Sequence, residues 1–168
     1  MTYYPTSVFA IDPGIESMGY AYWEKDDELL MPVTGIIRYH GGRNDHKTWY
    51  EKAVVQVTKL REIILPLLPI KMVVCELPEF YGSTYVSGVM KLTYLVGCIG
   101  FMIKDINDGI AESRIYFVNP TSWKGQLKKN IVARRIREYY TQQSQTCHEF
   151  IDDEWDAIGM GLWVMGKF

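Results

Sequence analysis

The sequence has 168 residues, of which 48% are apolar and 23% charged, the balance of an ordinary globular domain. A net charge of −2 gives no overall basic excess, so any binding of nucleic acid would depend on local clusters of positive charge. Three scattered cysteines form no CxxC pair, which argues against a disulfide framework or a zinc site and leads us to expect a cytoplasmic protein.

The first part of the chain predicts three short strands. Residues 7–12 form an apolar run that Pro13 and Gly14 end, as in a buried strand followed by a turn. Residues 18–24 and 33–39 are rich in aromatic and β-branched residues and are separated by acidic or Gly-containing turns. We therefore expect three antiparallel strands joined by hairpins.

The period changes from about residue 44, and apolar residues from Trp49 to Leu67 recur at intervals of three and four, which predicts a long helix. Pro66 and Pro69 then end the helix. Residues 71–76 form a nearly continuous apolar run, typical of a central strand that is buried on both faces.

A second long helix is predicted over residues 84–106. Its longest apolar run, residues 92–103, is shorter than the about 20 residues needed to cross a bilayer. We therefore expect this helix to be buried in the protein, with no membrane span. The N-terminus also lacks the basic and apolar pattern of a secretory signal.

The remaining residues complete a recognisable order of elements. Residues 114–118 predict a fifth strand, and Pro120 is followed by a basic loop, a basic helix and a final helix from about residue 149. The order β-β-β-α-β-α-β-α-α, with no linker or repeat, indicates one α/β domain over residues 1–168. It implies a five-stranded mixed sheet with helices on both faces, which is the RNase H-like arrangement.

Acidic residues end two strands that this arrangement places side by side. Asp12 ends the first strand and Glu76 the fourth, and ligands of open α/β sheets bind beyond the carboxyl ends of the strands. Asp153 and Asp156 are three residues apart on the last predicted helix and so share a face. Asp152 and Asp156 would share a face as well. We expect Asp12, Glu76, Asp153 and Asp156 to converge.

A cluster of carboxylates points to metal chemistry. Like charges close together cannot all ionise cheaply, and divalent cations remove that penalty. Mg²⁺ prefers carboxylate oxygens and shares its remaining positions with substrate phosphate. Two ions about 4 Å apart would activate water and stabilise the departing oxygen in phosphodiester hydrolysis. Each acid also has a structural interpretation, since Asp12 could shape its turn and Asp153 and Asp156 could be solvated helix charges.

A run of positive charge precedes the last acids, with six basic residues and no acid in fourteen positions: Lys124, Lys128, Lys129, Arg134, Arg135 and Arg137. A solvated helix face is the simpler interpretation of such a run. Its position next to the acids favours a basic track that leads nucleic acid to a metal site. We predict DNA contacts at Lys124, Lys128, Lys129, Arg134 and Arg135, and also at Trp123 in the predicted loop.

In this order, these residues resemble the RuvC-like Holliday junction resolvases over nearly the whole chain. The similar segments are residues 10–14 (AIDPG), 18–21 (MGYA), 74–76 (VCE), 89–97, 119–125 (NPTSWKG) and 153–157 (DEWDA). The loop between Lys124 and the next lysines is shorter than in bacterial members. The compact, divergent sequence suggests a phage-type or otherwise specialised member, acting in the host cytoplasm if phage-encoded.

The resemblance implies an endonuclease that resolves four-way DNA junctions by paired nicks, with two Mg²⁺ or Mn²⁺ ions in each active site. It gives metal-binding and catalytic roles to Asp12, Glu76, Asp153 and Asp156. Lys124, and Lys128 or Lys129, take the places of the basic loop lysines, and Lys124 is a candidate to lower the barrier at the scissile phosphate. Phe80 or Tyr81 resembles the aromatic residue that stacks at the junction centre.

The resemblance also implies a homodimer. A four-way junction has near two-fold symmetry, and a symmetric dimer would present two active sites to matching strands. Gly88, Gly97 and Gly100 would let the 84–106 helix approach a second copy closely, although packing within the chain explains their spacing equally well.

Two other functions compete within this fold. An RNA-processing nuclease related to YqgF also opens with an acid and a glycine in its first hairpin, and a non-catalytic junction-binding protein could use the same fold. An actin-like ATPase is disfavoured, because it needs two duplicated halves and further glycine-rich phosphate loops.

Overall fold

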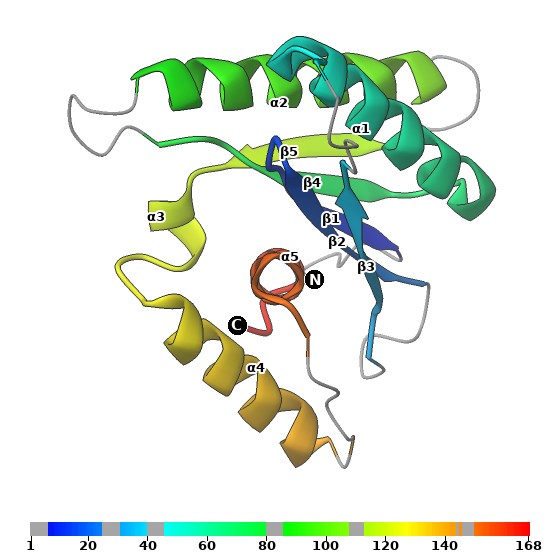
Figure 1. The fold of residues 1–168 in the computed structure, drawn as a ribbon. Helices are drawn as coiled ribbons and strands as arrows, with labels where there is room; N and C mark the ends of the chain where they lie inside the picture. Colours follow the sequence, from blue (N-terminus) through cyan, green and yellow to red (C-terminus); the bar gives the residue numbers. More distant parts are fainter. Residues whose placement is uncertain are drawn as a thin grey trace.

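The computed structural model describes residues 7–24, 31–39, 46–79, 86–107, 113–143, 145 and 150–168. Within these residues, five strands form one sheet in the order β3-β2-β1-β4-β5, with helices on both faces (Figure 1). The strands are β1 (Val8–Asp12), β2 (Ser17–Trp23), β3 (Val33–Arg38), β4 (Met72–Glu76) and β5 (Arg114–Val118). The helices are α1 (Trp49–Ile64), α2 (Val86–Asn107), α3 (Pro120–Trp123), α4 (Lys129–Gln142) and α5 (Asp152–Val164).

The sheet is mixed, as predicted. β1 pairs antiparallel with β2, and β2 pairs antiparallel with β3, which gives the two hairpins. β4 pairs in parallel with β1 on one side and with β5 on the other. Each predicted strand agrees with an observed strand to within one residue at either end. The predicted α/β, RNase H-like sheet is therefore confirmed.

Two segments differ from the prediction. α1 begins at Trp49, the first residue of the predicted apolar face, but ends at Ile64, after which Leu65–Leu67 form a 3₁₀ turn. The turn contains Pro66, which has no N–H to continue the α-helical ladder. The predicted basic loop after Pro120 begins with the short helix α3, because a proline is compatible with the first helical position.

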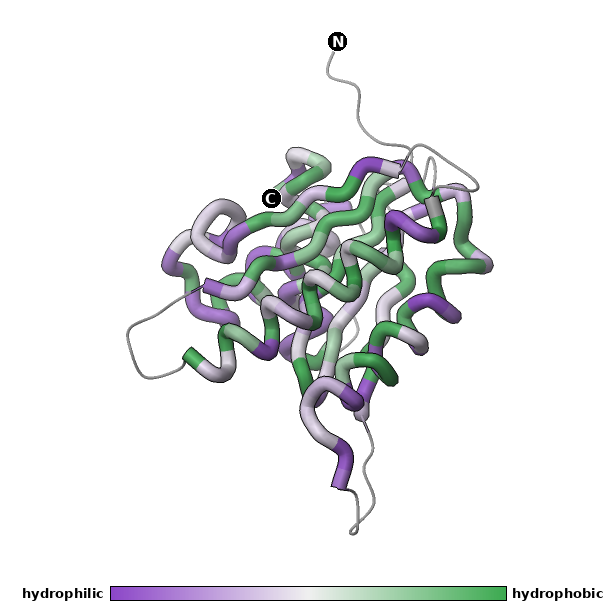
Figure 2. The backbone as a smooth tube through the Cα atoms, turned by 90° about the horizontal axis from the view of Figure 1, so that it is seen from above, coloured by the Kyte–Doolittle hydropathy of each residue, from purple (hydrophilic) through white to green (hydrophobic). Residues whose placement is uncertain are grey.

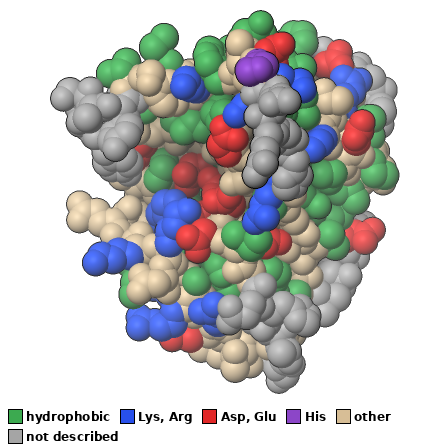
Figure 3. Space-filling model, in the orientation of Figure 1, with side chains coloured by type: hydrophobic (Ala, Val, Ile, Leu, Met, Phe, Trp, Pro, Cys, Tyr) green, Lys and Arg blue, Asp and Glu red, His purple; other side chains and the backbone are tan. Residues whose placement is uncertain are grey.

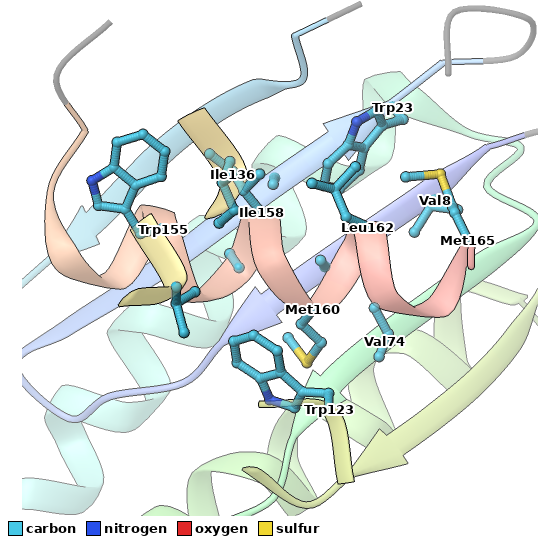
Figure 4. Close-up of a cluster of buried hydrophobic side chains, with 14 of the residues drawn as sticks. Val8, Trp23, Val74, Trp123, Ile136, Trp155, Ile158, Met160, Leu162 and Met165 are labelled. Atoms are coloured by element: carbon cyan, nitrogen blue, oxygen red, sulfur yellow. The ribbon is translucent and has the colours of Figure 1, made fainter. Parts of the chain in front are cut away.

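The sheet separates two apolar cores. Alternate residues of β1 face opposite sides, so Phe9 and Ile11 pack under α1 and α2, whereas Val8 and Ala10 pack under α5. Figure 4 shows the second core, in which side chains from the sheet, α3 and α4 surround α5. Figure 2 shows apolar residues concentrated in the central strands and mixed with hydrophilic ones along the helices. α5 therefore lies across the face of the sheet opposite to α1 and α2.

α2 is buried on one side only. Leu95 and Ile99 are buried against the sheet, whereas Met90 and Phe101 are 64% and 76% exposed. Among the described helices it is the one long and apolar enough, by length and composition alone, to cross a bilayer, and a third of that window is buried. The prediction of a buried helix is therefore wrong for its outer face.

Candidate active site

The strand ends bring the first two predicted acids together. Asp12 is the last residue of β1, and Glu76 is the last residue of β4. These strands are hydrogen-bonded neighbours in parallel, with Ile11 opposite Cys75 in the register. The carboxyl ends of parallel neighbours lie at the same edge of a sheet. Asp12 and Glu76 are therefore adjacent at this edge.

The first turn of α5 brings the other two acids to the same edge. α5 crosses the sheet against β1 and β2, and its backbone passes so close to Gly19 that a Cβ there would overlap the backbone oxygen of Asp153. Gly19 is the register partner of Asp12. Because Gly19 has no side chain, Asp153 and Asp156 can reach the strand ends.

Hydrogen bonds fix the start of α5 on strands β2 and β3. The Ser17 hydroxyl donates to Asp153 Oδ2, and the Thr34 hydroxyl donates to Glu154 Oε1 at 2.9 Å. The other oxygen of Glu154 accepts the Ile151 backbone N–H at 3.0 Å. Acidic residues in a first turn also interact favourably with the helix dipole. Ser17 was not predicted, and no motif spacing in the sequence links it to a residue 136 positions away.

Lys124 lies inside the acidic cluster. Its ammonium is 2.9 Å from Asp156 Oδ2 and 3.3 Å from Glu76 Oε2. Its side chain is only 15% exposed, and that of Asp156 is 3% exposed. The structure therefore brings Lys124 together with two of the predicted acids. Such a pair is unfavourable to bury unless its hydrogen bonds are made, and removal of either partner leaves a buried charge.

Trp123 does not lie in an exposed loop as we predicted. The side chain is buried, with 5% exposure, and its indole N–H donates to Glu76 Oε2 at 2.7 Å. The Lys124 ammonium also lies 4.8 Å from the centre of the indole ring. A buried ring cannot stack on a DNA base. The prediction of a DNA contact at Trp123 is therefore wrong, because its place in α3 turns the ring into the core.

Burial and neighbouring charges shift the pKa values of Asp12, Glu76 and Lys124. Burial, followed by the charges of Glu76, Asp156 and Asp153, raises the pKa of Asp12 well above its usual value, and Lys124 only partly opposes this. Burial also raises the pKa of Glu76, against the lowering influence of Lys124 and of the Trp123 hydrogen bond. Burial alone would lower the pKa of Lys124, but the neighbouring carboxylates outweigh it and raise that pKa.

The donor set fits hard divalent cations. Asp156 Oδ1 is buried and has no hydrogen-bond partner among the described residues. A buried carboxylate oxygen without a partner is costly, and carboxylate oxygens are the ligands that Mg²⁺ prefers. In the described part of the chain, no three Asp, Glu, His or Cys side chains lie close enough together to hold a metal ion as they stand, and the Lys124 ammonium lies between Glu76 and Asp156. The Lys124 ammonium supplies the neutralising charge in this arrangement.

Basic residues of α4 border the acidic hollow. On the face shown in Figure 3, acidic side chains gather in a central hollow that Lys and Arg side chains flank. Lys129 Nζ lies 3.8 Å from Asp153 Oδ1 and 3.7 Å from Asp156 Oδ2. Lys128 and Arg135 are exposed, and exposed Arg134 contacts Glu138 at 3.6 Å. Lys129 therefore adjoins the acids, and the other predicted basic side chains are exposed just before α4 and further along it.

Phe80 and Tyr81, which we predicted to stack at the centre of a junction, lie outside the described residues. β4 ends at Glu76, and the described residues continue to Glu79. Asp152, the alternative to Asp153, is exposed and lines a separate hollow with Lys129, Arg137 and Phe150.

Comparison with known proteins gives matches of structure only. No family model matches the sequence, and no curated protein matches it. RuvC of Thermus thermophilus superposes with a TM-score of 0.67 at 15% identity, over 93% of this chain and 91% of that chain. The same protein in complex with its Holliday junction substrate gives 0.69 at 18% identity, over 94% and 90% of the chains.

A second resolvase has a similar structure. The yeast mitochondrial Holliday junction resolvase Ydc2 gives a TM-score of 0.65 at 16% identity, over 98% of this chain and 82% of that chain. The agreement of structure extends over almost the whole chain. The chain therefore has the RuvC-like fold of Holliday junction resolvases, with its four predicted acids around one edge of the sheet.

Proposed function

We propose that this chain is a magnesium-dependent endonuclease that resolves four-way DNA junctions by paired nicks. One observation carries the proposal: Asp156, with a buried and unpartnered oxygen, lies in one cluster with Asp12, Glu76 and Asp153. The RuvC-like fold supports it, since T. thermophilus RuvC has been solved with a Holliday junction substrate. Mn²⁺ would substitute for Mg²⁺, because its preference for carboxylate ligands is similar.

Each side chain of the site has a defined part in this proposal. Asp12, Glu76, Asp153 and Asp156 would hold two divalent cations. When bound, these ions supply an activated water and compensate the charge on the departing oxygen of the phosphodiester. Ser17 holds Asp153 in place through its hydrogen bond. Lys124, which stays protonated between Glu76 and Asp156, would turn its ammonium toward the scissile phosphate.

The basic side of α4 would hold the nucleic acid backbone over these acids. Lysine and arginine contacts to phosphate fix the position of a duplex without reading its sequence. Lys129 contacts both the acids and the solvent, with its side chain 52% exposed, so it would guide the strand into the hollow. Lys128, Arg134 and Arg135 would continue the contact away from the site.

The outer face of the α1 and α2 layer supports a homodimer. Val86, Met90, Tyr94 and Phe101 form an exposed apolar stripe along α2, beside a groove of about 520 Å³ between α1 and α2. A Cβ on Gly88 or Gly97 would meet nothing within 4 Å, so these glycines leave that surface open, whereas Gly100 packs against Phe117. We propose that a second copy covers this stripe, which would give two active sites for two matching strands.

A cleavage assay tests the proposed function. Purified protein is incubated with Mg²⁺ and a mobile four-way junction, a linear duplex or a structured RNA, with Glu76→Gln as the control. Paired nicks in the junction that are lost in Glu76→Gln are expected. Preferential cutting of RNA would favour the RNA-processing alternative. A protein that binds the junction tightly but does not cleave it in the presence of any divalent cation tested would favour the non-catalytic alternative.

A further inference from the structure

Trp123 connects the acidic cluster to the core. Its Nε1 donates to Glu76 Oε2 over 2.7 Å, and the ring is 5% exposed. The next residue, Lys124, reaches the same oxygen at 3.3 Å. Two successive residues at the end of α3 thus place two donors on one oxygen of Glu76. A carboxylate held in this way has little freedom to rotate about its terminal bond.

The packing of the ring fixes the direction of that N–H group. α5 presents Gly159 to the ring, and a Cβ there would lie 2.7 Å from Trp123 Cζ3. The ring of Phe168 lies 6.1 Å away, centre to centre, in a tilted arrangement. Figure 4 shows Trp123 beside Met160 of α5, on the side of the sheet where the second core lies. The indole is therefore held in place by the core and points its polar edge at the site.

We propose that Trp123 is a positioning residue, which sets the orientation of the Glu76 carboxylate for binding a divalent cation. The inference rests on the proposed function, because it takes Glu76 as a metal ligand. Hydrogen-bond partners that orient metal ligands typically contribute about 10–100-fold to metal affinity or activity. Trp123 would act in this way without touching either metal or DNA.

The test compares two tryptophan-to-phenylalanine variants in the same core. Trp123→Phe keeps an aromatic ring but loses the N–H that reaches Glu76. Trp23→Phe is the matched control, because buried Trp23 belongs to the same core and its Nε1 donates to the Tyr140 hydroxyl at 3.2 Å. Mn²⁺ affinity is measured without DNA, by electron paramagnetic resonance of the free ion. We expect affinity to fall by about 10-fold in Trp123→Phe and to stay within about 2-fold in Trp23→Phe.

A second measurement avoids any change to Trp123. The indole N–H signals of the five tryptophans are assigned in the wild type by nuclear magnetic resonance. Titration with Mg²⁺, and separately the substitution Glu76→Gln, should shift the Trp123 signal and leave the Trp23 signal in place. This readout remains available even if Trp123→Phe folds poorly.

The outcomes separate the two levels of the argument. Wild-type affinity for Mn²⁺ in Trp123→Phe, or a Trp123 signal that neither Mg²⁺ nor Glu76→Gln moves, would overturn the role of Trp123 alone. Mn²⁺ binding that Glu76→Gln does not weaken would overturn the proposed function, and the positioning role with it. A selective loss in Trp123→Phe together with the selective shift supports both.

Discussion

At the scale of single residues, the ionised Asp12 carboxylate should destabilise the metal-free protein, although the proposed metal site requires it. Its pKa is raised by burial and by the three neighbouring carboxylates. A carboxyl whose pKa is higher in the folded state binds its proton more tightly there than in the unfolded chain. The metal-free protein should therefore be stabilised below the ordinary carboxyl pKa of about 3.9 and lose that stability as the pH rises through the raised value.

The first prediction follows from this sign. Asp12→Asn should abolish cleavage but melt at a higher temperature than the wild type at pH 7 in the presence of a chelator. Each kcal/mol of relieved repulsion corresponds to about 2–4 °C for a domain of this size. The difference should disappear near pH 4, where the wild-type carboxyl is protonated. Thermal melts across pH check this, and an Asp12→Asn protein that melts lower at every pH would contradict it.

Metal addition provides the companion measurement for the same variant. A ligand that binds only the folded state raises its stability. Excess Mn²⁺ should therefore raise the melting temperature of the wild type and leave that of Asp12→Asn nearly unchanged. Equal shifts in both proteins would mean that Mn²⁺ binds elsewhere.

The second prediction concerns the choice between Asp152 and Asp153. Asp153 accepts a hydrogen bond from Ser17 and lies near Lys129, whereas Asp152 is exposed beside the separate hollow. Loss of a hydrogen-bond partner of a metal ligand typically lowers activity by up to about 100-fold. Asp153→Asn should lower the cleavage rate by more than this, because Asp153 is proposed to bind the metal itself. Asp152→Asn should stay within a few-fold of the wild type. Single-turnover cleavage rates of the two variants distinguish the two residues. A large loss in Asp152→Asn with little loss in Asp153→Asn would show that Asp152 is the metal ligand.

At the scale of elements, the basic residues at the start of α4 are expected to differ in role, with Lys128 contributing to DNA binding alone and Lys129 to both binding and cleavage. Lys128 precedes its first turn and faces solvent, and Lys129 contacts the acids. Each phosphate contact removed should reduce the slope of log affinity against log salt by about 0.9 on duplex DNA. Lys128→Ala should therefore weaken junction and duplex binding alike with an unchanged saturated rate. Lys129→Ala should lower that rate as well.

Arg61→Ala is the control for these α4 variants. Arg61 is paired with Asp105 at 2.8 Å, on the opposite side of the sheet. DNA affinity is measured by fluorescence anisotropy at several salt concentrations. The affinity of Arg61→Ala should equal that of the wild type at each concentration. A loss of affinity in Arg61→Ala equal to that in Lys128→Ala would argue against a track on α4.

The elements also show how far the sequence could be interpreted. Apolar periodicity found every strand, because a buried strand has to be apolar on the faces that it buries. It missed the end of α1, because Leu67 continues the apolar spacing although Pro66 has already turned the chain into a 3₁₀ helix. It also placed Trp123 in a loop, since a polar neighbourhood in sequence does not reveal that Gly159, far along the chain, leaves room for the ring.

In the candidate site, the acids at the strand ends could be predicted from the sequence, whereas contacts made through α5 could not. Asp12 and Glu76 could be paired because each ends an apolar strand, and the sheet order then makes them neighbours. Ser17, by contrast, is an ordinary hairpin residue until α5 is placed across it. The position of Lys124 between two acids also depends on packing, because only the folded chain brings α3 against α5.

At the scale of the whole molecule, the exposed stripe on α2 leads to a prediction about how two copies assemble. Phe101 is 76% exposed, so Phe101→Arg should leave the monomer folded and prevent a second copy from packing there. Val33→Arg is the matched control, because Val33 is 64% exposed on the edge strand β3. Light scattering should find the wild type and Val33→Arg as dimers and Phe101→Arg as a monomer with fewer paired nicks.

Two results would remove the dimer through α2. One is a wild-type protein that scatters as a monomer at concentrations where it cuts junctions. The other is a Phe101→Arg protein that remains dimeric and makes paired nicks at the wild-type rate. Either would mean that another surface, or no surface, joins two copies.

The way α5 is built into the molecule has a consequence for cooperativity. This helix carries Asp153 and Asp156 and also fills the core between the sheet and α4, with Ile158 and Leu162 fully buried. The acids cannot leave the strand ends by local fraying unless that core opens as well. Loss of function and loss of structure should thus form a single transition, in which urea removes the capacity to bind Mn²⁺ at the same midpoint as the tryptophan fluorescence changes. A binding midpoint well below the fluorescence midpoint would reveal a separately unfolding unit at α5.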